Sequence, residues 1–139
     1  MFDKILHAND GSQSAIQAFS LALEIAQQNN SELHMVCVEE IDYMPEFIEE
    51  IREEIKTAAH RFRKIVQQSR ALAEEKHVHL HTHVVAGHPV RTVVALAGEL
   101  NANLLVLGAR GHSRIPEWLV GSRADRMMHL ARCPVLIVK

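Results

Sequence analysis

The sequence has few of the residues that stabilise small extracellular domains. Only two cysteines occur among 139 residues, Cys37 and Cys133, and they do not form a Cys-x-x-Cys pair. A domain of this length buries about two-thirds of the surface that its unfolded chain exposes, so its core needs neither disulfides nor a structural metal. We therefore expect one domain, residues 1–139, with free thiols, and an inert core position for Cys37.

Long apolar runs, a basic leader and a strong net charge are also missing. No apolar stretch approaches the roughly 18 residues of a membrane span, and Met1-Phe2-Asp3 begins with an acid where a targeting segment carries basic residues. The 15 basic and 17 acidic residues nearly balance, which gives no overall attraction to nucleic acid or anionic lipid. We expect a cytoplasmic protein with neither nucleic acid nor membrane as a partner. By contrast, the chain holds ten histidines.

Short apolar runs alternate with segments of helical periodicity along the whole chain. Turn and cap residues close the first run at Asn9-Asp10-Gly11-Ser12. Strand-helix alternation of this kind predicts an α/β fold with a five-stranded parallel sheet and helices on both faces. The expected strands are 4–8, 33–38, 78–86, 104–107 and 135–138, and the expected helices are 12–29, 45–76, 90–100 and 122–132.

The second helical segment is long for a domain of this size. Residues 45–76 would span about 48 Å at 1.5 Å per residue, so we expect a break or a projecting first half. The apolar stripe from Ile48 to Leu72 indicates core packing rather than a partner helix. The excess length, with acidic residues at 49–54, leaves room for a partner contact.

A glycine-rich stretch follows the fourth expected strand. Gly108 and Gly111 permit positive φ and close approach of a ligand, and Gly121-Ser122 places free N–H groups at a helix start. This combination suits an anionic oxygen such as phosphate, but ordinary turn and cap chemistry explains it equally well on spacing alone. Arginines that add positive charge to the stretch are Arg110, Arg114 and Arg123.

Several known motifs are excluded. The loop is no Walker A sequence, because no Gly-Lys-Ser/Thr follows, and the first strand carries no Gly-x-Gly-x-x-Gly. Residues 111–115 lack the final glycine of a nucleophile elbow. No carboxylate, histidine or lysine of the loop stands out as a base for water, so fast catalysis is not expected.

Four parts of the chain resemble, in order, the ATP-binding branch of the universal stress protein family. The loop has the spacing Gly-x2-Gly-x9-Gly-Ser from Gly108 to Ser122. The other matching segments are KILHANDGS at 4–12, Ala86–Pro89 and Cys133–Val138. The match spans the whole chain, whereas His7 and Asn9 stand where the family more often has apolar residues.

The resemblance implies strand order 3-2-1-4-5, which would place Asp10 opposite Gly108. In the family, the aspartate at this place contacts the nucleoside, the backbone at the place of Val38 meets the adenine, and the loop with its serine holds ribose and phosphates. From the residues alone, Asp10 fits a helix cap equally well. The expected nucleotide-binding residues are Asp10, Val38, Gly108, Arg110, Gly111, His112, Gly121, Ser122 and Arg123, without a metal ligand or catalytic residue.

The expected function is a stress-response switch or sensor that binds ATP or a related adenine nucleotide, with or without Mg²⁺. Two alternatives stay open. One is slow ATP hydrolysis, or nucleotidyl or phosphoryl transfer, with His112 or Ser122 near the phosphates. The other is an interaction module with a vestigial pocket, and the resemblance implies a homodimer through residues 135–138 in either case.

Two further features lie outside the motif. His77, His79, His81 and His83 alternate with strand period, so we expect their rings on one face of an edge strand, exposed and protective against aggregation. Neighbours two apart lie about 7 Å apart, and a transition-metal site, the alternative, would need His88 or an acid from the long helix. We expect Trp118 to fill core space beneath the loop rather than to cover a nucleotide.

Overall fold

The computed structural model describes residues 1–41, 47–112, 114–116 and 118–139. The expected connection through Asp42 and Pro45, and with it the expected helix start at Pro45, lies outside the described residues. None of the described helices combines the length and the hydropathy needed to cross a bilayer. Both cysteines are free thiols, and burial of Cys37 in the core raises the pKa of its thiol to about 12, so that it stays protonated.

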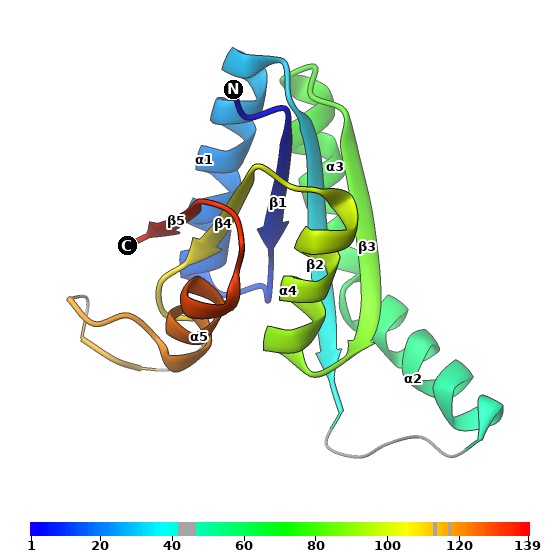
Figure 1. Ribbon diagram of the computed structural model, residues 1–139. Helices are drawn as coiled ribbons and strands as arrows, with labels where there is room; N and C mark the ends of the chain where they lie inside the picture. The colour runs from blue at the N-terminus through cyan, green and yellow to red at the C-terminus, as the bar shows by residue number, and fades with distance from the viewer. Residues whose placement is uncertain (42–46, 113, 117) are drawn as a thin grey trace.

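Five parallel strands form one sheet in the order β3-β2-β1-β4-β5 (Figure 1). Both the class and the strand order are confirmed. The first strand is central and is paired on both sides, since Ile5 lies between Leu33 of one neighbouring strand and Leu104 of the other. The strands are β1 (Lys4–Ala8), β2 (Glu32–Glu40), β3 (Leu80–Gly87), β4 (Leu104–Gly108) and β5 (Val135–Val138).

Helices cover both faces of the sheet, as expected (Figure 1). On one face, α1 (Gln13–Asn29) and α3 (Arg63–Glu75) bury residues such as Phe19 and Ala73 against the strands. On the other face, α4 (Pro89–Leu100) and α5 (Ser122–Leu130) pack over β1, β2 and β4. Because every strand is parallel, all five carboxyl ends lie at one edge, and the ligand-binding end of the molecule is thereby defined.

The long helical segment is broken, as expected from its length. It forms α2 (Ile48–Arg61) and α3, separated at Phe62, whose ring is buried. Figure 1 shows α2 projecting away from the sheet. Arg61 anchors its end by donating from Nη1 to both carboxylate oxygens of Glu39, each at 3.2 Å. The first part of this helical segment therefore lies away from the core.

Core packing of the whole apolar stripe is a wrong expectation. Ile48, Ile51 and Ile55 are 64%, 44% and 49% exposed, and Ala58 is the one buried residue among the described residues of α2. The physical reason is direction, because α2 leaves the sheet at an angle (Figure 1), and only its carboxyl-terminal end, with the buried Ala58, lies against β2 and β3. The periodicity predicts a helix correctly but carries no information on where the helix points.

His7 is a polar residue in the fully buried centre of β1. Its Nδ1–H donates to the Val106 carbonyl at 2.9 Å, while Nε2 has no hydrogen-bond partner in the described structure. Burial lowers the pKa of His7 to about 4, so the ring is neutral in the folded protein at pH 7. An apolar side chain would avoid the unsatisfied nitrogen.

This buried histidine predicts a loss of stability in mild acid. The unfolded chain binds a proton on His7 below pH 6.5 and the folded chain only below about pH 4, so stability falls as pH drops between these values. From pH 7 to pH 5 the contribution of His7 is a loss of about 2 kcal/mol. Urea unfolding at both pH values measures it. His7→Leu should lose about 2 kcal/mol less over this range, and an equal loss in both proteins would contradict the assignment.

Candidate functional site

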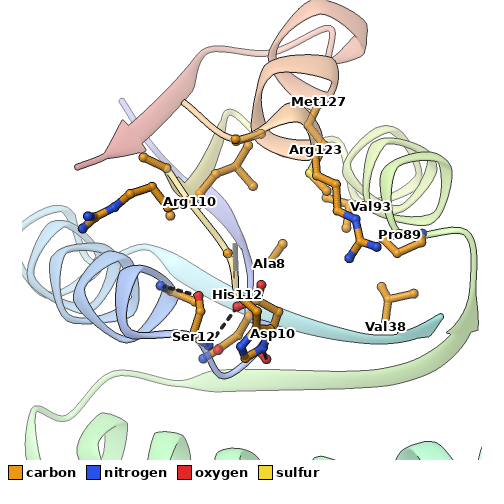
Figure 2. Close-up of a pocket in the computed structure, with 18 of the residues that line it drawn as sticks. Ala8, Asp10, Ser12, Val38, Pro89, Val93, Arg110, His112, Arg123 and Met127 are labelled. Atoms are coloured by element: carbon orange, nitrogen blue, oxygen red, sulfur yellow. Dashed lines mark hydrogen bonds between the residues drawn. The ribbon is translucent and has the colours of Figure 1, made fainter. Parts of the chain in front are cut away.

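A cavity of about 480 Å³ opens at the carboxyl ends of the strands, between α1, α4 and α5 (Figure 2). It lies where the strand order reverses, since β1 is followed in sequence by β2 on one side and paired with β4 on the other. Ligands of open parallel sheets bind at this switch point, and the volume is typical of a small-molecule site.

The structure brings all the sequence-predicted site residues to this one cavity. They come from the ends of β1, β2 and β4, from the glycine loop and from the first turn of α5. Those that line it are Asp10, Val38, Gly108, Arg110, Gly111, His112, Gly121, Ser122 and Arg123. Their convergence is a property of the fold, and their role toward a nucleotide stays a prediction.

The turn after β1 is held by short side-chain hydrogen bonds. The Asn9 Oδ1 atom accepts from the Gly11 N–H and the Asp10 Oδ1 atom from the Ser12 N–H, both at 2.9 Å. The helix cap is Ser12, whose hydroxyl accepts from the Ala15 N–H at 3.2 Å. Asp10 thus shapes the turn without capping α1, and its second oxygen faces the glycine loop.

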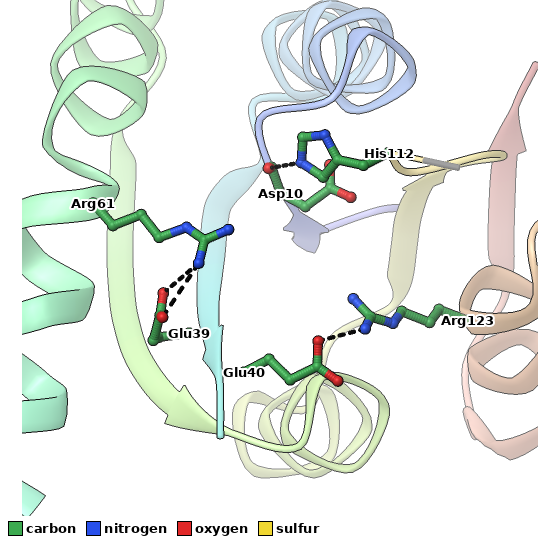
Figure 3. A network of polar contacts seen from close by, with 6 residues as sticks. All are labelled: Asp10, Glu39, Glu40, Arg61, His112 and Arg123. Carbon is green, nitrogen blue, oxygen red and sulfur yellow. Dashed lines mark hydrogen bonds and ion pairs between the residues drawn. The ribbon is translucent and has the colours of Figure 1, made fainter. Parts of the chain in front are cut away.

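His112 joins the glycine loop to this turn. Its Nε2–H donates to the backbone carbonyl of Asp10 at 2.7 Å (Figure 3). A Cβ added to Gly111 would lie 3.1 Å from Asp10 Oδ2, which places the carboxylate directly against the loop. Asp10 therefore lies opposite the loop, and the exposed imidazole of His112 links the loop to the turn after β1.

The three loop glycines serve different needs. Gly111 has φ +58°, a conformation that favours glycine. Gly108 does not have positive φ, contrary to our expectation; a Cβ there would lie 2.7 Å from backbone atoms of Ser14 and Ala15 in α1. At Gly121 a Cβ would lie 3.1 Å from the Ala109 carbonyl oxygen. Two of the glycines thus permit close backbone packing around the cavity.

The start of α5 supplies hydrogen-bond donors to the cavity. Its N-cap is Gly121, and no side chain of the described structure caps it. The Gly121 N–H is taken by the Ala109 carbonyl, whereas the first N–H groups inside a helix have no partner within that helix. Ser122 is exposed at this end. The positive end of the helix dipole and these donors favour an anion.

An apolar wall faces this polar end, and sequence reasoning missed most of it. Its members come from β2, β4 and the cavity-facing sides of α4 and α5. They are Val36, Val38, Pro89, Val93, Leu107 and Met127. Val38 alone was expected, from its place at the end of the second strand. The others are ordinary strand and helix core residues in sequence, with no signal that distinguishes a cavity wall from a filled core.

The two expected arginines differ in direction. The Arg110 backbone N–H donates to Ser14 Oγ at 3.4 Å, and Figure 2 shows its guanidinium extending toward α1 and away from Arg123. Arg123 reaches across the cavity mouth, where Nη2 lies 2.5 Å from Glu40 Oε2 at the end of β2 (Figure 3). The α5 side and the β2 side of the mouth are therefore bridged by one exposed ion pair.

Trp118 does not fill core space beneath the loop. Its side chain is 74% exposed, so the expectation of core packing is wrong. Ala109 at the start of the loop is buried and Val120 near its end packs partly against the core formed by α4 and α5, whereas Trp118 extends to solvent. The sequence places an aromatic residue in the loop but does not fix its direction.

The fold and cavity define an α/β protein of the doubly wound class with a small-molecule site at the switch point. The chain belongs to the universal stress protein family, whose family model matches residues 1–139. It is 34% identical to universal stress protein YxiE of Bacillus subtilis (strain 168) over 151 aligned residues, which cover 100% of each chain. The family resemblance read from the motifs is confirmed.

Solved structures agree with this assignment. Universal stress protein UspA from Lactobacillus plantarum is similar with a TM-score of 0.85 and 25% identity, over 99% of this chain and 98% of that one. A universal stress protein in complex with cAMP is similar with a TM-score of 0.77 and 25% identity, over 99% and 97% of the two chains. The similarity therefore extends over the entire domain.

Proposed function

We propose that this chain binds ATP or a related adenine nucleotide and acts as a stress-response switch or sensor without fast catalysis. The observation that carries the proposal is the cavity itself, which has an apolar wall at one end and backbone donors at the other. An adenine nucleotide has the matching polarity, with a flat base at one end and anionic phosphates at the other. The solved family member in complex with cAMP supports an adenine nucleotide as ligand.

Each part of the nucleotide has a matching part of the cavity. The base fits the wall beside Val38 and Pro89, where apolar contact and ring-face packing stabilise it. The phosphates fit the glycine loop and the start of α5, where the Ser122 hydroxyl and free N–H groups donate to anionic oxygens. Asp10, between these ends, is placed to accept from sugar hydroxyls.

Mg²⁺, when it accompanies ATP, finds few protein ligands here. Asp10 is the one carboxylate among the described residues that line the cavity, and its Oδ1 atom already accepts from the Ser12 N–H. Mg²⁺ usually keeps several waters and binds substrate phosphates with one or two carboxylates. The residues therefore fit an ion carried by the phosphates, with Asp10 Oδ2, which faces Gly111, as the protein oxygen available to it.

The described cavity residues also include few groups that could act as a general base for hydrolysis of ATP. A general base needs a free acceptor within hydrogen-bond reach of water. The Nε2–H group of His112 donates to the Asp10 carbonyl, which fixes the ring in the loop and leaves Nδ1 as its acceptor, and one carboxylate oxygen of Asp10 is used by the turn. Both groups shape the loop, so we favour binding over hydrolysis or phosphoryl transfer.

The proposal is tested by calorimetric titration of the purified chain with ATP, with and without Mg²⁺. The expected result is saturable binding of one ATP per chain. Absence of saturable binding at millimolar ATP would contradict the proposed function. Titration with cAMP and with adenosine isolates the contribution of the phosphates, because adenosine retains the contacts of the wall and of Asp10 but has no phosphate.

The Arg123–Glu40 ion pair is expected to compete with the nucleotide. Glu40 holds the guanidinium and adds a negative charge at the cavity mouth. Glu40→Gln should therefore tighten ATP binding by about threefold, since an exposed ion pair is worth less than about 1 kcal/mol. Calorimetry checks this against Glu99→Gln, an exposed acid at the end of α4 that lies outside the cavity. Unchanged or weaker binding in Glu40→Gln would show that Arg123 does not serve the ligand.

We also propose a homodimer through β5. Within the described chain, β5 pairs with β4 alone and its residues are only half-buried. Leu130, shortly before it, is 51% exposed. A charged residue in an exposed edge strand opposes edge-to-edge association. Light scattering at micromolar concentration should give the mass of two chains, and Ile137→Lys should give the mass of one; a single-chain mass before the substitution would contradict the dimer.

A further inference from the structure

A second cluster of chemically active side chains lies outside the cavity lining, on the amino-terminal halves of β2 and β3. Glu32 and His34 lie on β2, and His81 lies on β3 directly beside His34 in the register. One ligand atom from each of these three residues lies within 4.8 Å of the other two. Along β2, His34 lies two residues before Val36, a span of about 7 Å to the nearest wall residue of this strand, and four residues before Val38, a span of about 13 Å.

The distances within the cluster are already close to those of a metal site. His34 Nε2 lies 2.7 Å from Glu32 Oε1, and His81 Nε2 lies 3.8 Å from the same oxygen. The His34 and His81 rings stack at 4.5 Å with an interplanar angle of 15°. A tetrahedral ion with bonds of about 2.0–2.2 Å places its ligands about 3.3–3.5 Å apart, so small side-chain rotations complete the site.

A supporting hydrogen bond fixes the central ligand. His34 is nearly buried, with 6% of its side chain exposed, and its Nδ1 lies 2.9 Å from His83 Nε2. Metal-bound histidines commonly use the other ring nitrogen in this way, which fixes the ring orientation and the tautomer. When a metal replaces the hydrogen bond between His34 Nε2 and Glu32, the Nδ1–H group of His34 donates to His83 Nε2, so His83 acts as a positioning residue for His34.

The sequence suggested His88 or an acid of the long helix as additional metal ligands, whereas the strand register supplies others. His88 is the N-cap of α4, where its Nδ1 accepts from the Arg91 N–H. His77 lies in a turn before β3 with φ +58°, outside the strand and the cluster, so the expectation of four rings on one strand face is wrong for this residue. The cluster instead obtains an acid and a histidine from the neighbouring strand.

We propose that Glu32, His34 and His81 form a binding site for a divalent transition-metal ion of the zinc type. Two imidazoles and one carboxylate form a ligand set used by zinc, with a fourth position for water or for the exposed His79, whose ring contacts that of His81 at 4.5 Å. The site is independent of the nucleotide cavity and joins the edge strand β3 to β2.

The test measures Zn²⁺ binding to the purified full chain by competition with a colorimetric chelator. We expect one Zn²⁺ per chain with a Kd of about 1 µM. Glu32→Gln and His81→Asn should each weaken binding by about 100-fold, because loss of a ligand costs at least as much as loss of a supporting hydrogen bond. The matched control is His77→Asn, which makes the same change in the same histidine tract outside the cluster and should leave the affinity within about threefold.

Folding and geometry are checked in the same proteins. Circular dichroism and ATP affinity should be unchanged in all three variants, and Co²⁺ bound to the parent chain should give the visible absorption of a tetrahedral site. The proposal is overturned if the parent chain holds no Zn²⁺ at about 10 µM, if Glu32→Gln binds as tightly as the parent, or if His77→Asn weakens binding as much as His81→Asn. Glu32→Gln keeps the side-chain shape, so it decides the matter even if His81→Asn fails to fold.

Discussion

Ser122→Glu is expected to weaken ATP binding by about 100-fold while leaving the fold intact. The substitution places a carboxylate at the first position of α5, inside the proposed phosphate end of the cavity. Two like charges about 4 Å apart repel by about 1 kcal/mol in water and about 4 kcal/mol near a protein surface, which brackets the roughly 2.7 kcal/mol of a 100-fold effect. The same carboxylate is favourable for the helix, because negative charge stabilises a helix N-terminus.

Because Ser122→Glu should weaken ATP binding without destabilising the helix, its effect on binding can be separated from an effect on folding. Urea unfolding should show Ser122→Glu to be as stable as the parent chain or slightly more stable, so weak binding cannot be ascribed to unfolding. Ser122→Gln is the matched control, since it has nearly the same size without the charge, and it should lose about tenfold or less. If Ser122→Glu binds ATP as tightly as Ser122→Gln, the phosphates do not lie at the start of α5.

Gly108→Ala is expected to destabilise the protein by about 3 kcal/mol. The added Cβ would lie 2.7 Å from the Ala15 backbone nitrogen and 2.7 Å from the Ser14 carbonyl carbon. These are backbone atoms of the first turn of α1, which cannot rotate away as a side chain does. Relief requires α1 to move from β4, and overpacking of this kind costs about 1–3 kcal/mol or more. Urea unfolding at pH 7 measures the change.

Gly98→Ala is the matched control for this prediction. Gly98 lies inside α4, where an added Cβ has no heavy atom within 4 Å. Alanine is the better helix former by about 0.5–1 kcal/mol, so this change should stabilise the protein. The two substitutions are chemically identical and should have opposite signs. A Gly108→Ala protein as stable as the parent would show that close packing of α1 does not require glycine.

Most of the fold could be predicted because local signals agree with one another. The strands other than β3, where histidines alternate with other residues, contain short apolar runs. The helices α1 and α4 end at Asn30 and Asn101, both in the left-handed conformation that stops a helix. The length of the second helical segment predicts a break or a projecting first half, but it does not give the position of the break at Phe62. The direction of α2 could not be predicted, because the exposed Ile51 and the buried Ala58 belong to one continuous periodic stripe. Periodicity defines a face, and only tertiary structure determines what covers it.

The polar half of the candidate site was also predictable, whereas the apolar half was not. Glycines and a serine at fixed spacing have local conformational reasons that appear in the sequence. Val93 and Met127 become wall residues only because α4 and α5 leave a gap over the sheet. The histidine cluster depends on a third kind of information, the strand register that sets His34 beside His81.

The most direct test of nucleotide binding uses the amide signals of the six glycines in an NMR titration with ATP. Three of them line the cavity, at Gly108, Gly111 and Gly121, whereas Gly87 and Gly98 do not line it. Saturable shifts of the three cavity glycines, with Gly87 and Gly98 unmoved, are the predicted result. Unmoved cavity glycines at millimolar ATP, or shifts confined to residues outside the cavity, would contradict the proposal.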